Sequence, residues 1–139
     1  MSLIFLLDTN TLSEPLRPRP NENVLRKIAT HRQEIAMATP VIQEILFGCN
    51  RLPLSRKRRQ IETYLQKSVL SKIPILSYDL TAAVWHARER ARLVSIGRTP
   101  PFADSQIAAI AKANDLILVT NNIADYANFN DLEVENWHG

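Results

Sequence analysis

The chain of 139 residues has few side chains that could form a catalytic thiolate site or a disulfide. It contains one cysteine, Cys49, so an internal disulfide is excluded. No histidine stands with Cys49 in a recognisable catalytic signature, and we expect the thiol to pack as a small buried group. The histidines show no spacing typical of metal ligands, so we expect them to be surface or packing residues. They are His31, His86 and His138.

The chain also lacks long apolar runs. None approaches the roughly 18 residues that a membrane-spanning helix needs. The first apolar stretch is too short for a secretory signal, and no basic segment precedes it. No internal repeat, low-complexity tract or long linker divides the sequence. We therefore expect one domain over residues 1–139, in the cytoplasm and not at a membrane, with enough residues for a real core.

Positive charge is in slight excess, with a net charge of +3 and a pI of about 9.3. Alone, this is a weak indication of a nucleic-acid partner. The basic residues gather in two places, around the run Arg56–Arg59 and at Arg88, Arg90 and Arg92. Either cluster alone is expected to be a solvated helix face. Together with an acidic site, they would suit a polyanionic substrate.

Short apolar segments alternate with longer amphipathic ones, which predicts a three-layer α/β/α sandwich with a mostly parallel central sheet of four to five strands. The expected strands are residues 3–7, 35–38, 73–76, 116–119 and 132–134. The expected helices are residues 22–33, 39–50, 56–70, 80–95 and 102–114, with shorter helical turns at 9–16 and 122–126.

Three local signals refine this prediction. Thr39 is expected to cap a helix with its hydroxyl, followed by Pro40 at the first helical position. Pro74 lacks a backbone N–H, which indicates that the third strand lies at a sheet edge. In a doubly wound order, strands one and four would be neighbours with the switch point between them.

Four acidic residues lie beside apolar segments, where an unpaired carboxylate is costly. Asp8 ends the first strand, Asp125 follows the fourth, and Glu44 and Asp104 are expected near the N-terminal ends of their helices. Ligands of an open parallel sheet bind outside the carboxyl ends of its strands. If the four carboxylates converge there, they form a hard-oxygen site that suits Mg²⁺ or Mn²⁺.

Each acid also has an ordinary explanation. Asp8 would serve as a helix N-cap, and Glu44 would extend to the surface. Asp104 would complement a helix dipole, and Asp125 would lie on a solvated turn. The case for a site rests on all four falling at one predicted edge.

The sequence resembles PIN-domain proteins, especially VapC-type toxins, in four segments that occur in order and at the usual spacing over nearly the whole chain. These are Leu6–Glu14, Thr39–Gly48, Asp104–Ala111 and Leu118–Tyr126. The chain departs from the family's pattern at Asn121, where arginine is frequent, and at Asp115, where glycine is common. The first departure removes a possible phosphate contact, and the second concerns a turn.

The resemblance implies a metal-dependent endoribonuclease, the toxin of a bacterial toxin–antitoxin pair, acting on RNA as a homodimer and bound by a cognate antitoxin. Its acidic positions correspond to Asp8, Glu44, Asp104 and Asp125, of which we expect Asp8 and Asp104 to bind Mg²⁺ or Mn²⁺ directly. Its supporting polar positions correspond to Thr9, Asn10, Thr120 and Asn122, with Thr120 and Asn122 expected to orient carboxylates by hydrogen bonds.

Two other classes of protein remain as alternatives. A catalytically silent PIN-like module that only binds RNA or protein would be expected to have lost at least one acid, and none is missing. A different phosphoryl enzyme is the second alternative. An aspartyl-phosphate phosphatase would carry Asp-x-Asp after the first strand, where this chain has Asp8-Thr9-Asn10.

Overall fold

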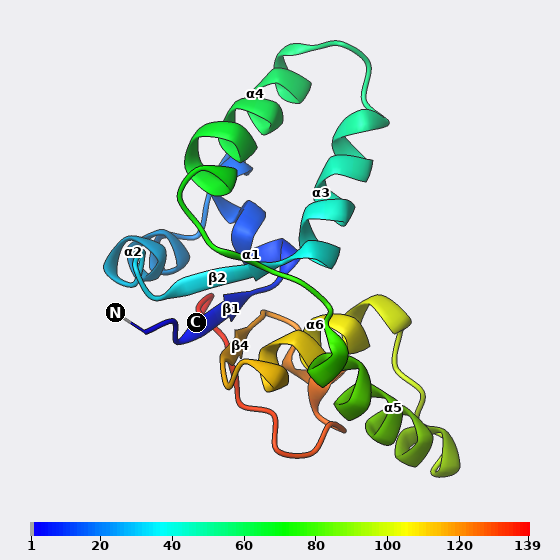
Figure 1. The fold of residues 1–139 in the computed structure, drawn as a ribbon. Helices are drawn as coiled ribbons and strands as arrows, with labels where there is room; N and C mark the ends of the chain where they lie inside the picture. Colours follow the sequence, from blue (N-terminus) through cyan, green and yellow to red (C-terminus); the bar gives the residue numbers. More distant parts are fainter. Residues whose placement is uncertain (1) are drawn as a thin grey trace.

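The computed structural model describes residues 2–139, so Met1 of the expected domain lies outside the described residues. Its five-stranded sheet has the order β3-β2-β1-β4-β5, and every pair of neighbours is parallel. β1 and β4 are therefore adjacent, as predicted, and β3 lies at an edge (Figure 1). The strands are β1 (Phe5–Leu7), β2 (Ile35–Ala38), β3 (Ile75–Leu76), β4 (Ile117–Val119) and β5 (Val134–Glu135).

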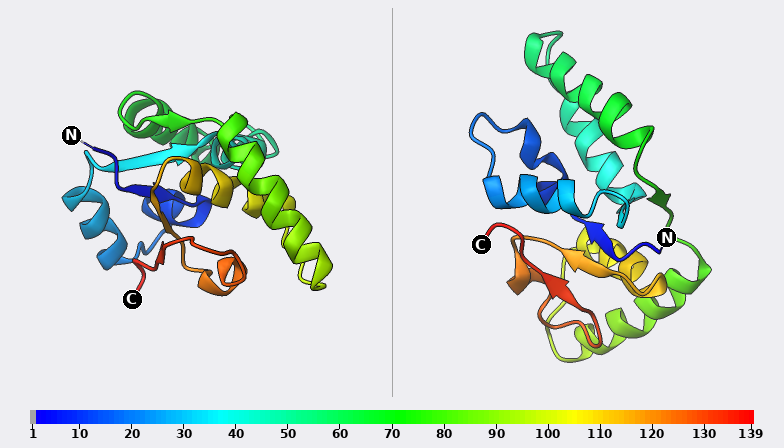
Figure 2. Two further views of the ribbon diagram at one scale, coloured as in Figure 1. Left: turned by 60° about the horizontal axis from the view of Figure 1, so that its bottom comes forward. Right: turned by 90° about the vertical axis from the view of Figure 1, so that its left-hand side faces the viewer.

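Helices cover both faces of the sheet, which confirms the predicted α/β architecture. α1 to α4 lie on one side, whereas α5 and α6 pack together on the other (Figures 1 and 2). The helices are α1 (Thr9–Ser13), α2 (Glu22–Thr30), α3 (Thr39–Asn50), α4 (Arg56–Tyr64), α5 (Leu80–Ser95) and α6 (Phe102–Ala113). Tighter or wider turns form η1 (Glu14–Leu16), η2 (Leu65–Leu70) and η3 (Ile123–Tyr126).

The chain winds outward from β1 to β2 and β3, then returns to β4 on the other side of β1. Right-handed crossovers in opposite directions place the two sets of helices on opposite faces. The strand order thus reverses between β1 and β4. At this point the loops after the two strands separate, which leaves a crevice at the carboxyl edge of the sheet.

The core consists of the strands and the inward faces of the helices. β1 and β2 are buried along their whole length, and α6 contributes a continuous buried stretch from Ile107 to Ala111. Trp137 closes the core near the C-terminus and packs edge-on against Phe5. No helix among residues 2–139 is both long and apolar enough to cross a membrane.

Several expected boundaries were wrong by a few residues. The first and third strands begin two residues later than expected, the fourth begins one residue later, and the last shifts to Val134–Glu135. Strand bounds follow the backbone pairing, which the apolar run alone does not define. α2 ends at Thr30 because a turn at residues 31–34 leads into β2. α6 ends at Ala113, with Asn114 as its cap.

Two helix details also differ. α3 begins at Thr39, with Ala38 as the N-cap and no side-chain capping bond, so Pro40 is the second helical residue. Glu44 lies in the second turn of α3. The expected single helix to Leu70 changes at Leu65 from α-helix to the wider π-helix of η2.

Candidate active site

The structure brings all eight sequence-predicted site residues to one small pocket at the carboxyl edge of the sheet. Its volume is about 90 Å³. Two residues that the sequence analysis did not single out, Ile107 and Tyr126, complete its wall. The lining residues are Asp8, Thr9, Asn10, Glu44, Asp104, Ile107, Thr120, Asn122, Asp125 and Tyr126. Convergence of segments so distant in sequence follows from the adjacency of β1 and β4.

Asp8 leaves β1 at the floor of this pocket and is only 6% exposed. Its backbone N–H donates to the carbonyl oxygen of Val119 at 3.0 Å, which fixes the ends of β1 and β4 side by side. One carboxylate oxygen, Oδ1, accepts a hydrogen bond from the backbone N–H of Thr11 at 2.8 Å. Asp8 therefore caps the N-terminus of α1 and also lines the pocket.

Glu44 reaches the pocket from α3, which packs against α1. The hydroxyl of Thr9 donates to Oε2 of Glu44 at 2.8 Å. This bond ties the first residue of α1 to the second turn of α3 and holds the Glu44 carboxylate in one direction. Thr9 is thus a positioning residue for Glu44 in the structure.

Asp104 lies in the first turn of α6, and its surroundings in the pocket shift its pKa. Partial burial raises the pKa of Asp104, and the nearby charges of Asp125, Glu44 and Asp8 raise it further. A hydrogen bond from the hydroxyl of Tyr126 offsets part of this rise. Carboxylates that repel one another in this way favour a bound cation.

The remaining polar residues take different places. The hydroxyl oxygen of Thr120 accepts a hydrogen bond from the backbone N–H of Asn122 at 3.0 Å. Within residues 2–139 neither side chain hydrogen-bonds to a carboxylate, so the geometry does not show the orienting role expected of them. Asn10 and Asn122 are exposed at the rim. Tyr126 follows Asp125 directly, and that adjacency was the sequence signal that could have identified it.

The donors in the pocket are carboxylate, hydroxyl and amide oxygens, which hard divalent cations prefer. Among residues 2–139, however, no three His, Cys, Asp or Glu side chains are arranged so that they could already hold a metal ion. The pocket has room for several waters, since each needs roughly 10–15 Å³ of such space. The residues therefore fit a cation that retains part of its water shell.

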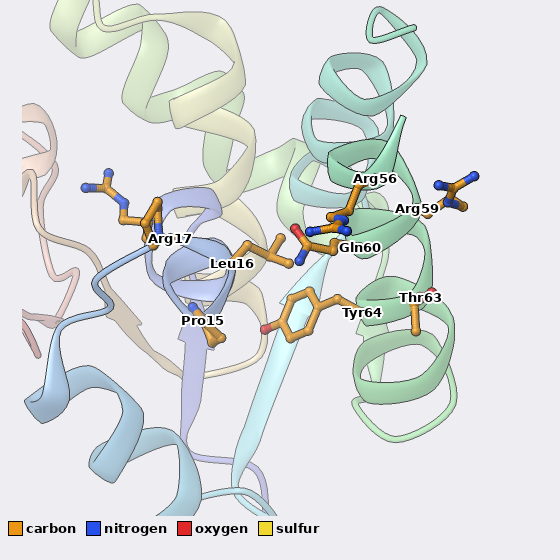
Figure 3. Close-up of a pocket in the computed structure, with 9 residues that line it drawn as sticks. Pro15, Leu16, Arg17, Arg56, Arg59, Gln60, Thr63 and Tyr64 are labelled. Atoms are coloured by element: carbon orange, nitrogen blue, oxygen red, sulfur yellow. The ribbon is translucent and has the colours of Figure 1, made fainter. Parts of the chain in front are cut away.

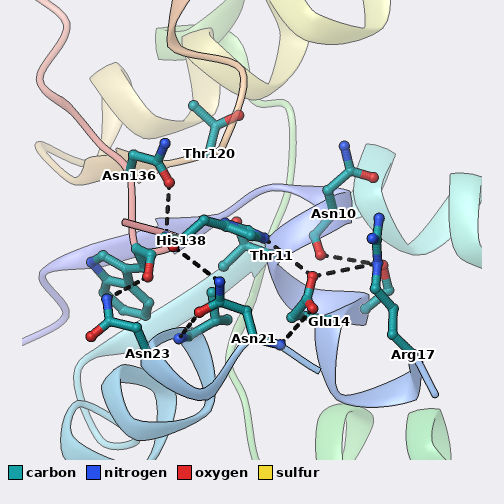
Figure 4. Close-up of polar contacts among 12 residues, drawn as sticks. Asn10, Thr11, Glu14, Arg17, Asn21, Asn23, Thr120, Asn136 and His138 are labelled. Atoms are coloured by element: carbon teal, nitrogen blue, oxygen red, sulfur yellow. Dashed lines mark hydrogen bonds and ion pairs between the residues drawn. The ribbon is translucent and has the colours of Figure 1, made fainter. Parts of the chain in front are cut away.

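A second buried carboxylate, Glu14, lies beyond the C-terminal end of α1 and has a different environment (Figure 4). It is 3% exposed, and Oε2 accepts from the backbone N–H of Asn21 at 2.8 Å. Oε1 lies 3.1 Å from Nε2 of His138 and 3.4 Å from Nε of Arg17. Burial alone would raise the pKa of Glu14, but these contacts outweigh it and the pKa is lowered.

The Glu14 cluster fastens the C-terminal residues to the start of the chain. The side-chain amide of Asn21 donates to the carbonyl oxygen of His138 at 3.0 Å, and that of Asn23 donates to the carbonyl oxygen of Trp137. Glu14, Asn21 and Asn23 thus hold the last residues against η1 and α2 (Figure 4). Their contacts are structural, and they do not line the acidic pocket.

The thiol and imidazole side chains lie where the sequence analysis expected packing groups. Cys49 is buried in α3. His86 is buried, shares a hydrogen bond of 2.8 Å with the hydroxyl of Tyr78 and packs on Phe102. His31 stacks on Trp137. None of these groups lines the acidic pocket.

Known proteins are similar to this chain in sequence and in fold. A family model described as PIN domain matches residues 5–129. The chain is 32% identical to Toxin FitB of Neisseria gonorrhoeae over 97% of this chain and 99% of that protein. It is 26% identical to the tRNA(fMet)-specific endonuclease VapC of Shigella flexneri over 97% and 98% of the two chains. The crystal structure of FitAcB from Neisseria gonorrhoeae matches with a TM-score of 0.87 and 31% identity, covering 98% of this chain and 100% of that one.

Proposed function

The chain belongs to the PIN domain family, and we propose that it is a metal-dependent endoribonuclease, the toxin of a type II toxin–antitoxin system, which cleaves RNA at the acidic pocket. Relatives named as a toxin and as an RNA endonuclease support the activity. The observation that carries the assignment to this pocket is the convergence of four carboxylates from four segments, where burial and the charges of the other three raise the pKa of Asp104.

The four acids have different roles in this proposal, according to their positions in the pocket. Asp8 and Asp104, which both line the pocket, are the groups that would hold Mg²⁺ or Mn²⁺. When bound, such an ion supplies Lewis acidity, which polarises a phosphodiester and acidifies a nearby water. Glu44, oriented by Thr9, and Asp125, exposed at the rim, face the entering substrate and orient the attacking water.

The partners follow from the same assignment. Several similar solved structures are toxin–antitoxin complexes, and we infer that a cognate antitoxin binds this chain and suppresses its activity. We also infer a homodimer as the active form. Co-expression with the cognate antitoxin should relieve growth arrest, and co-purification should show the complex directly.

Incubation of the purified protein with total RNA tests the activity. We expect cleavage with Mg²⁺ or Mn²⁺, and none with a chelator. Asp8→Asn retains the shape of the side chain and removes its charge, so cleavage should be lost while circular dichroism remains unchanged. Full cleavage by a folded Asp8→Asn protein would overturn the assignment to this pocket. A silent PIN-like binding module would instead bind RNA without cleaving it under any metal condition.

A further inference from the structure

A second and wider cavity, of about 730 Å³, lies between η1 and α4 (Figure 3). Pro15, Leu16 and Tyr64 give it an apolar wall, and Arg17, Arg56 and Arg59 lie around it. Gln60, Thr63 and Pro18 complete the lining. Hereafter this cavity is called the basic groove. Among residues 2–139, no acidic side chain lines it.

Only some residues of the basic run at the start of α4 line the basic groove. Arg56, Arg59, Gln60 and Thr63 are separated by three, four and seven positions, so they share one face of the helix. Arg58 is used within the fold, since its Nη1 donates to the carbonyl oxygen of Leu52 at 2.9 Å and its Nε lies 3.8 Å from Glu62. The groove therefore has a specific composition that a uniformly solvated basic helix would not show.

The guanidinium groups of Arg56 and Arg59 are available to a ligand. Arg56 and Arg59 are exposed, and among residues 2–139 neither forms a side-chain hydrogen bond or ion pair. The side chain of Arg17 is 61% exposed even though Glu14 lies beneath it. Arginine presents several N–H donors in a planar fork, which matches the oxygens of a phosphodiester.

Tyr64 gives the groove a fixed aromatic wall. Its hydroxyl donates to the carbonyl oxygen of Leu12 at 2.6 Å, which joins α4 to α1. Burial raises the pKa of Tyr64 to about 12, so the hydroxyl stays protonated and retains this bond at neutral pH. A ring held in place beside arginines is a surface on which a base can stack without ordering a new side chain.

The basic groove and the acidic pocket are connected by one continuous helical segment. Asp8 caps the start of α1, Pro15 and Leu16 lie in η1, and Arg17 follows η1. The α-helical residues of this segment rise by about 1.5 Å each and the 3-10 residues by about 2.0 Å each, so the segment spans roughly 13 Å. An RNA strand whose phosphodiester enters the pocket therefore has its neighbouring nucleotides within reach of the groove.

We propose that the basic groove binds the sugar–phosphate backbone of the RNA strand a few nucleotides from the cleaved bond, with Arg56 and Arg59 contacting phosphates. This inference rests on the proposed ribonuclease function. An acidic segment of a protein partner is the other occupant that the groove's charge would accept. RNA is favoured because the groove lies along the same helical segment as the acidic pocket and combines phosphate donors with a fixed ring.

Salt-dependent binding tests the proposal. The probe is a short fluorescein-labelled single-stranded RNA of mixed sequence, measured by fluorescence anisotropy in the Asp8→Asn background, where no cleavage interferes. Each lost phosphate contact should reduce the slope of log K against log salt by about 0.7, or about 5-fold in affinity near 0.1 M salt. Arg56→Ala/Arg59→Ala should thus weaken binding about 25-fold and flatten the slope by about 1.4.

Lys57→Ala/Lys67→Ala is the matched control, because both lysines are exposed and neither lines the groove. It removes the same net charge and should change affinity and slope far less. In the cleaving protein, the arginine variant should raise KM with little change in kcat, because the groove lies away from the reacting bond. Circular dichroism confirms that each variant is folded.

Equal losses of RNA affinity in the two double variants would overturn the assignment of RNA binding to the groove. The losses would then reflect the total positive charge of the protein and not a specific contact. Unchanged RNA binding with loss of antitoxin co-purification would instead assign the groove to a protein partner. The ribonuclease function can fail separately. If the wild type never cleaves RNA but the arginine variant still binds it about 25-fold more weakly, the groove stands and the cleavage assignment falls.

Discussion

Asp104 and Glu14 are both carboxylates removed at least in part from water, but their surroundings differ in sign. Glu14 faces a backbone N–H, an imidazole and a guanidinium, and its pKa is lowered. Asp104 faces three other carboxylates, with one hydrogen bond from Tyr126, and its pKa is raised. The carboxylate of Glu14 is therefore paired with hydrogen-bond donors and basic groups of the fold. The charges that act on Asp104 are negative.

The contrast separates an acid that is paired within the fold from the acids that we propose to be functional. A satisfied carboxylate contributes to stability and needs no ligand. A group of repelling carboxylates lowers stability unless a cation binds, which is the arrangement expected where folding has been compromised for chemistry. The two residues are thus matched probes, since the same acid-to-amide change should affect activity at one and stability at the other.

The largest effect is expected at Asp104. Asp104→Asn should reduce RNA cleavage by more than the roughly 10–100-fold that loss of a supporting partner costs. The melting temperature in metal-free buffer should be unchanged or slightly higher, because one of the repelling charges is gone. Cleavage assays and thermal melts on the same preparation measure both. Retention of cleavage would place Asp104 outside the reaction and remove the contrast with Glu14.

The opposite pattern is expected for Glu14→Gln. The amide replaces an acceptor that has three donors, so buried polar groups are left poorly paired, at a cost of about 1–3 kcal/mol. Each kcal/mol lowers Tm by several degrees in a domain of this size. Cleavage per folded molecule should be retained at a temperature below the transition. Wild-type stability with lost cleavage would show that Glu14 belongs to the site after all.

A smaller effect on cleavage is expected from Thr9→Val, which retains the shape of the side chain and removes the hydroxyl that orients Glu44. The loss of such a supporting bond should slow cleavage by about 10-fold. Thr9→Ser restores the hydroxyl and should recover most of the rate. If serine and valine behave alike, the bond to Glu44 contributes nothing to the reaction.

The smallest effect is the pH dependence of stability in metal-free buffer. The lowered pKa of Glu14 contributes stability above its ordinary value of 4.5, which is lost as pH falls through the folded-state pKa. The raised pKa of Asp104 has the opposite sign, because its penalty at neutral pH is relieved as pH falls through the folded-state pKa toward 3.8. Melts from pH 7 to pH 3.5 should therefore show less acid loss in Glu14→Gln and more in Asp104→Asn than in wild type.

The sequence predicted which residues line the site better than it predicted how their side chains are placed. Asp8, Glu44, Asp104 and Asp125 stand out in the sequence because carboxylates are costly beside apolar segments, and parallel strands bring their carboxyl ends to one edge. The same reasoning overlooked Tyr126 and the hydrogen bond from Thr9 that orients Glu44. A side chain's direction depends on where its helix begins and on which helix packs beside it, and neither is local information.

The alternation of strands and helices, the adjacency of β1 and β4 and the grouping of the four acids could be inferred from the residues alone, because apolar periodicity and the cost of burying charge are local properties of the chain. The pairing of Glu14 and the crowding of Asp104 depend on the folded arrangement. So do the contacts of Arg58 within the fold and the positions of Arg56 and Arg59 in the lining of the basic groove. Residues of the same charge differ in this way because pairing and desolvation depend on neighbours that are far away in sequence and close in space.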